Sequence, residues 1–125
     1  MAEMTAQVEA KSLDSPEETR PFEGDMGQVD LVHLSGLDVG RGTFKPGWRW
    51  SEHVRPIAGT DSCQVEHTGY VLSGRMTVRM DDGSETTVSP GDAFHMPPGH
   101  DAWTEGDEAC VILDFGGLHG YAERH

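Results

Sequence analysis

The residues of this chain best suited to chemistry are histidines and cysteines. The sequence contains seven histidines and two cysteines, Cys63 and Cys110. Imidazole nitrogens and thiolates are ligands for transition metals. Cys63 lies four residues before His67, so in a continuous strand the two side chains face the same side. Cys63 is therefore a candidate metal ligand or redox-active neighbour, the alternative being a small buried apolar residue.

A second set of side chains is expected to line a pocket for a small molecule. Trp50 and Trp103 each combine an apolar body with a polar N–H, and core packing is their alternative role. Arg55 offers a bidentate contact to a carboxylate, unless it is a loop arginine in solvent. His95 faces away from its two apolar neighbours, where it would line the pocket or point outward.

These residues are carried by a chain that turns often. It contains 16 glycines and 7 prolines in 125 residues, and turn signals recur about every 8–12 residues, as in sandwiches and barrels. Residues 75–80 alternate strictly between polar and apolar and are followed by an Asp-Gly turn at residues 81–84. No long segment shows a helical period. The pattern predicts an all-β fold.

The expected elements form one barrel with short extensions. Residues 1–27 are expected to be a polar, partly mobile N-terminal arm, residues 28–118 a single barrel, and residues 119–125 a C-terminal tail. Residues 54–62 are expected to be a loop, acting as a lid or as a tolerated surface insertion. Strands are predicted over residues 29–34, 38–44, 48–53, 63–72, 75–80, 85–88, 93–96, 100–104 and 109–115.

Two stretches resemble the motifs of the cupin superfamily. The first motif has a Gly, five residues, H-x-H, a short gap, a Glu, six residues and a Gly. Gly47 followed by His53 matches its opening, and Gly74, at the end of the Tyr-Val-Leu-Ser-Gly segment 70–74, matches its close. The second motif has a Gly, five residues, P-x-G and then a His, and residues 91–99 match its glycines and proline. The resemblance implies a double-stranded β-helix that usually binds a metal or a small molecule inside the barrel.

The ligand positions of this chain depart from the family pattern. Arg55 replaces the second His of H-x-H, His67 replaces the Glu, and Ala102 replaces the His of the second motif. His100 lies two positions before Ala102 and shares its face of a regular strand. With these changes, the resemblance predicts a metal site made of His53, His67 and His100, with Cys63 as a further candidate.

Three imidazoles would leave positions open for water or substrate. Such a site suits zinc, iron, nickel or copper. A pocket that is empty or purely organic is the alternative.

Composition excludes several classes of partner. Lys and Arg number 9 against 22 Asp and Glu, a formal net charge of −13. Nucleic acids and anionic membrane surfaces are therefore excluded as partners. The sequence has no apolar run of membrane-spanning length and its start lacks an apolar signal segment. We expect a cytoplasmic protein with free thiols.

The expected function is binding of a small polar, anionic molecule at a divalent metal inside the barrel. One class is a metal-dependent dioxygenase, isomerase or lyase, and the other is a binding or sensing module without turnover. No carboxylate is predicted in the pocket, which weighs against acid–base catalysis. A homodimer is predicted, with the arm around residues 20–22 crossing to the partner, unless the arm covers its own barrel.

Overall fold

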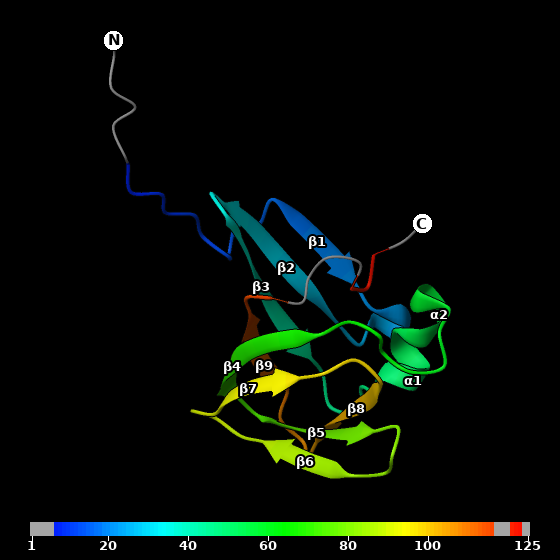
Figure 1. Ribbon diagram of the computed structural model, residues 1–125. Helices are drawn as coiled ribbons and strands as arrows, with labels where there is room; N and C mark the ends of the chain where they lie inside the picture. The colour runs from blue at the N-terminus through cyan, green and yellow to red at the C-terminus, as the bar shows by residue number, and fades with distance from the viewer. Residues whose placement is uncertain (1–6, 117–120, 124–125) are drawn as a thin grey trace.

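The structure is a computed structural model that describes residues 7–116 and 121–123 (Figure 1). Two short α-helices, α1 (Trp50–His53) and α2 (Arg55–Ala58), and one 3-10 helix, η1 (Glu23–Asp25), interrupt the strands. The strands are β1 (Glu18–Pro21), β2 (Gly27–Leu34), β3 (Leu37–Phe44), β4 (His67–Ser73), β5 (Arg75–Met80), β6 (Glu85–Val88), β7 (Ala93–Met96), β8 (His100–Glu105) and β9 (Cys110–Asp114).

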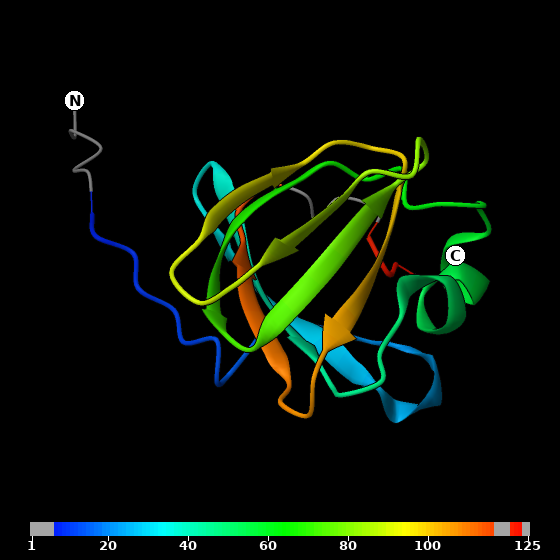
Figure 2. The same cartoon turned by 90° about the horizontal axis from the view of Figure 1, so that it is seen from below.

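The strands form two antiparallel sheets. The larger sheet has the order β1-β2-β3-β9-β4-β7, and the smaller has the order β6-β5-β8. Seen from below, the smaller sheet lies in front of the larger one, and the chain crosses between them repeatedly (Figure 2). This is the double-stranded β-helix, and the all-β prediction is confirmed.

The core fills the space between the sheets. Alternation explains how the strands supply it, because residues of β4 and β9 are buried at every second position. An aromatic cluster forms part of this core, with the ring centroids of Phe22, Phe44 and Trp48 lying 4.6 to 5.6 Å apart. The barrel interior is therefore packed with large side chains.

Part of the expected N-terminal arm belongs to the sheet. β1 and β2 are joined by a tight connection through η1, in which Gly24 has φ 71°. The two strands pair in a register that places Glu18 opposite Leu31. Phe22 is buried in the barrel of its own chain. Residues 1–6 of the arm, most of the expected tail and the expected end of the barrel at residue 118 lie outside the described residues.

The predicted strand over residues 48–53 is wrong beyond Arg49. Arg49 bridges Trp103, and the chain then turns into α1, where the His53 N–H donates to the Arg49 carbonyl (2.9 Å). The helical turn places Trp50 and Val54 on one face, and both are buried. Burial of these two side chains outweighs the alternating pattern that favoured a strand.

Residues 54–62 are also more regular than the predicted loop. α2 begins with Pro56 in its first turn and ends at Gly59, which has φ 75°. Proline in the first turn and glycine after the last are the ordinary signals of a short helix. In Figure 1, α1 and α2 lie together at one end of the barrel.

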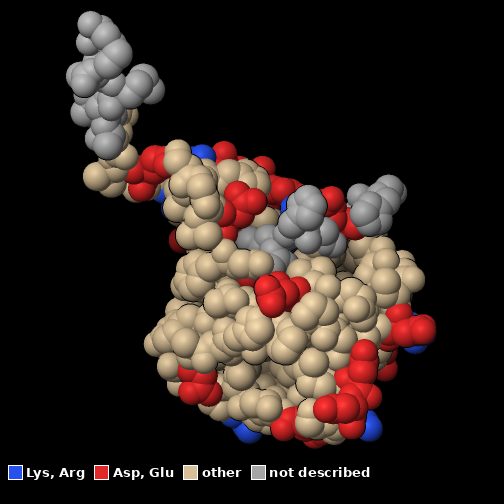
Figure 3. Space-filling view, in the orientation of Figure 1, with Lys and Arg blue, Asp and Glu red and all other residues tan. Residues whose placement is uncertain are grey.

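The surface follows the acidic composition. In Figure 3, acidic side chains lie mainly around the margin of the visible face, and its centre is largely uncharged. Within the described residues, no helix is both long and apolar enough to cross a membrane.

Candidate metal centre

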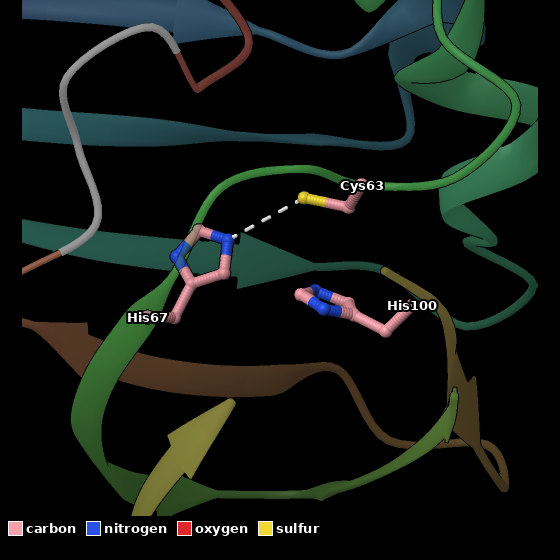
Figure 4. Close-up of side chains that lie close together, drawn as sticks. All are labelled: Cys63, His67 and His100. Carbon is pink, nitrogen blue, oxygen red and sulfur yellow. Dashed lines mark hydrogen bonds between the residues drawn. The ribbon is translucent and has the colours of Figure 1, made fainter. Parts of the chain in front are cut away.

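Three buried side chains meet inside the barrel. Cys63, His67 and His100 offer one sulfur and two nitrogen atoms that all lie within 4.8 Å of one another. The three residues are 2, 6 and 2% exposed. Figure 4 shows Cys63 and His67 on one stretch of the chain and His100 on another, with the three side chains pointing toward a common point. One ion could contact all three.

Backbone pairing brings this group together. Cys63 and His100 form an isolated antiparallel bridge, in which the Cys63 N–H donates to the His100 carbonyl (2.7 Å). Residues directly opposite in such a pair project to the same side. His67 opens β4 and pairs with Met96 of β7, three residues before the Gly99 turn that leads into β8. The predicted strand over residues 63–72 begins only at His67, but the bridge keeps Cys63 beside it.

Hydrogen bonds fix both imidazoles with the same nitrogen facing the group. Nδ1 of His67 donates to the buried carboxylate of Asp114 (2.6 Å), and Nδ1 of His100 donates to the Pro97 carbonyl (2.7 Å). Nε2 of His67 then lies 3.7 Å from Sγ of Cys63. An imidazole held through one nitrogen by a carboxylate or carbonyl is the usual arrangement of a metal-binding histidine.

The charges of the group depend on the same contacts. Burial alone would raise the pKa of the Cys63 thiol, but hydrogen bonds with His100 and His67 lower that pKa to about 6. Burial would lower the pKa of His67, and the bond to Asp114 together with Cys63 raises that pKa to about 9. At neutral pH Cys63 is therefore a thiolate, the form in which cysteine binds metals, beside a protonated His67. A metal ion that binds both residues displaces the proton on Nε2 of His67.

A small cavity adjoins the group. Its volume is about 30 Å³, room for about one or two water molecules or an ion. His67, His100 and Asp114 supply its polar wall, and the side chains of Trp48 and Trp50 line it as well. The remaining wall is apolar, from Val29, Gly42, Phe44, Met76, Met96, Ala102, Ile112 and Tyr121.

Cys63 lines a different pocket, next to the interior cavity. It has a volume of about 130 Å³ and runs beneath the segment expected to be a lid, from Val54 to Thr60. Trp50 and Tyr121 line both this pocket and the interior cavity. The segment over residues 54–62 thus borders a pocket that reaches the candidate centre, and its role as a lid stays a prediction.

His53, the first of the three predicted histidine ligands, is not part of the group. The helical turn of α1 sends it away from the barrel interior, where Nδ1 of its ring accepts the Arg49 N–H (3.0 Å). Its place is taken by Cys63. The first cupin motif can also be aligned from its closing glycine, Gly74. This puts His67 in the position of the Glu, and a three-residue gap before it then puts the H-x-H pair on Asp61 and Cys63. This alignment places Cys63, predicted only as a further candidate, on a ligand position of the motif in place of His53.

Of the predicted pocket residues, only Trp50 lines the interior cavity. Arg55 is exposed and pairs with Asp61 in solvent (3.0 Å). His95 points outward and pairs with Glu66 (2.9 Å). Trp103 also faces outward, because the inward face of β8 is occupied by its alternate residues.

Two residues that contact the group were not predicted from the sequence. Asp114 bonds His67, and the ring of Tyr121 meets that of His67 edge-on with centroids 4.7 Å apart. Asp114 could have been found, because it follows Cys110 and Ile112 at alternate positions on the buried face of β9. A carboxylate on such a face needs a partner. No pattern in the sequence indicates Tyr121.

The family comparison agrees with this geometry. The profile of the cupin domain family matches residues 58–116. The match includes Cys63, His67, His100 and Asp114, and it begins after His53. No curated protein matches the chain.

Solved structures share the fold at low sequence identity. A polyketide cyclase, RemF from Streptomyces resistomycificus, is 18% identical with a TM-score of 0.62, covering 89% of this chain and 80% of that one. A sugar phosphate isomerase of the cupin superfamily from Silicibacter pomeroyi is 21% identical with a TM-score of 0.61, covering 87% and 75%. A protein of unknown function from Rhizobium leguminosarum is 20% identical with a TM-score of 0.60, covering 90% and 99%. The double-stranded β-helix and the profile match together support a cupin domain over residues 58–116.

Proposed function

We propose that this chain is a metal-dependent cupin that binds one divalent transition metal ion through Cys63, His67 and His100 and takes up a small polar molecule beside it. The observation that carries the proposal is the convergence of these three donors within 4.8 Å. The Nδ1 atoms of both histidines are already bonded, so each ring offers Nε2 to the ion.

The donor set limits the identity of the metal. One thiolate and two imidazoles suit zinc, iron, nickel or copper, whereas magnesium and calcium prefer oxygen ligands. Structural zinc sites almost always have four protein ligands, but catalytic sites have three and keep a position open. The three donors of this chain support the second kind of site.

The residues of the chain hold and orient groups, and they offer little for proton transfer. Asp114 keeps the proton of His67 on Nδ1 and also accepts the Gly116 N–H (3.1 Å). Burial raises the pKa of Tyr121 well above its usual value, so this phenol stays protonated. When bound, the metal supplies a Lewis acid or a redox centre.

This arrangement supports oxygen chemistry over an isomerase or lyase that needs a free base. The two named relatives act on sugar phosphates or polyketides, and the cavity of about 30 Å³ is too small for either. The alternative is a sensing module without turnover. The scarcity of free acids or bases beside the group supports this alternative as well as it supports oxygen chemistry.

Elemental analysis of the purified protein tests the metal site. We expect about one transition metal ion per chain and, after reconstitution with cobalt(II), a thiolate-to-metal charge-transfer band in the near ultraviolet. His67→Ala and His100→Ala should each lower metal content about tenfold or more while circular dichroism still shows β structure. His95→Ala, a change at an exposed histidine, is the matched control and should retain the metal.

Equal metal content in all three variants would place the ion elsewhere and contradict the proposal. Oxygen uptake by the metal-loaded protein with a panel of small acids then separates the two classes. Turnover supports the enzyme, and saturable binding without turnover supports the sensor.

A further inference from the structure

Two tryptophans that line the cavity beside the candidate centre carry buried hydrogen-bond donors without acceptors. Trp48 and Trp50 are each 2% exposed, and both line the interior cavity with His67 and His100. Among residues 7–116 and 121–123, neither indole Nε1 has a hydrogen-bond partner. Trp103 is different, because its Nε1 donates to Glu105 (3.2 Å) at the surface.

Unpaired donors in a protein interior indicate a missing acceptor. A buried N–H without a partner costs about 1–3 kcal/mol, so nearly all such groups are paired in native proteins. Two unpaired indoles on one small cavity therefore point to one ligand in that cavity. Indole N–H only donates, so the ligand must carry acceptor atoms.

The volume of the cavity limits the size of that ligand. About 30 Å³ holds about one or two water-sized groups. The surrounding wall is apolar and closely packed, including Phe44, Met96 and Ile112, all less than 9% exposed. A sugar or an aromatic acid would not fit without moving these side chains.

We propose that Trp48 and Trp50 form a donor pair that binds a small acceptor ligand of two or three heavy atoms beside the metal. The inference rests on the proposed metal site and narrows its ligand class from small polar molecules to small inorganic or one-carbon acceptors. One end of the ligand would bind the metal held by Cys63, His67 and His100, and the indole N–H groups of Trp48 and Trp50 would donate hydrogen bonds to its lone pairs. Azide is a suitable probe of this class, since both of its ends accept hydrogen bonds.

Azide titration of the cobalt(II)-loaded protein tests the site. We expect the visible spectrum of cobalt to change saturably with azide and with formate, but not with benzoate. Trp48→Phe and Trp50→Phe should each weaken azide binding about 3- to 10-fold, the loss of one hydrogen bond, without changing cobalt affinity. Trp103→Phe, the matched control, should bind azide like the parent.

A second measurement needs no variant. The chain has three tryptophans, so the zinc-loaded protein gives three indole N–H signals in a nitrogen–proton correlation spectrum. Azide should shift the signals of Trp48 and Trp50 and leave that of Trp103 in place.

The outcomes separate the two proposals. Bound cobalt with no response to azide, or azide affinity unchanged in both Trp48→Phe and Trp50→Phe, overturns the donor pair and leaves the metal site standing. Benzoate binding as tightly as azide overturns the size limit. Failure to bind cobalt overturns the metal site and the donor pair together.

Discussion

Cys63 and Cys110 are both free and almost fully buried, at 2 and 0% exposure, yet their surroundings differ. Cys63 lies beside two imidazoles, which lower the pKa of its thiol to about 6 although burial raises it. Cys110 opens β9, pairs with Phe44 across the sheet, and has a pKa raised to about 12, mainly by burial. The same side chain is a thiolate in one region and an apolar packing group in the other.

The difference shows that burial alone does not assign a role to a cysteine. The Cys63 region lies where an isolated bridge replaces a regular strand, so its polar side chains converge from irregular segments. The Cys110 region lies within the β3–β9–β4 part of the larger sheet, where Cys110 pairs with Phe44 and the β4 register shifts once, between Val71 and Ser73. The candidate metal centre lies where the strands are irregular, and Cys110 lies where the sheet is paired on both sides.

The largest contrast is expected from removing each thiol. Cys63→Ala should weaken metal binding at least about 100-fold, because a direct ligand matters no less than the groups that orient ligands. Cys110→Ala should keep the metal affinity of the parent and lower the free energy of unfolding by about 1 kcal/mol, through lost packing. Metal titration and urea unfolding measure the two effects. Equal metal affinities would remove the contrast between the two cysteines.

Gly74, which packs against Cys110, tests how much the tight packing around Cys110 contributes to stability. Gly74 has φ 71°, and a Cβ there would lie 2.2 Å from the Ala109 carbonyl oxygen and 2.6 Å from Cα of Cys110. Gly74→Ala should therefore lower the free energy of unfolding by about 2–4 kcal/mol, measured in urea. Gly83→Ala is the control, since its φ is 92° but no atom lies within 4 Å, and should cost about 1 kcal/mol. Similar losses in both would show that φ, not contact with β9, sets the cost.

The carboxylate behind His67 provides the next test. Asp114→Asn keeps an acceptor for Nδ1 of His67 but removes the negative charge, so metal affinity should fall about 10- to 100-fold. Asp30→Asn is the control, because Asp30 is equally buried but accepts from Thr19 and Gln28 (both 2.9 Å) on the outer strands. Metal titration of Asp114→Asn and Asp30→Asn measures the two affinities. Equal metal affinity in the two variants would show that Asp114 does not tune the ligand.

Regular parts of the fold could be predicted from the sequence, and the irregular parts could not. The alternation of residues 75–80 and the Asp-Gly turn after them predicted β5 and its pairing with β6, and both are confirmed. The spacing of glycines and proline predicted the cupin barrel. The turn into α1 depends on the burial of Trp50 and Val54, which is a tertiary effect.

The candidate site was predicted only in part, because local sequence patterns specify regular strands but not tertiary contacts. His67 and His100 lie at or near motif positions on strands, so local pattern was sufficient to place them in the barrel. The adjacency of Cys63 and His100 depends on a bridge between segments 37 residues apart in the chain, which no local pattern specifies. His53 was predicted as a ligand because the strand was extended through a helix.

The smallest effect on metal binding is expected from changing His53. This change tests whether His53 lies outside the metal-binding group, as its position in α1 indicates. Its side chain is 16% exposed, accepts the Arg49 N–H, and lies against the turn at Gly24. His53→Ala should lower the free energy of unfolding by about 1 kcal/mol, through the lost hydrogen bond, and leave metal affinity within about twofold of the parent. Metal titration beside Cys63→Ala makes the comparison direct. A loss of metal as large as that of Cys63→Ala would bring His53 into the coordination sphere, because removal of a hydrogen bond inside α1 alone cannot account for it.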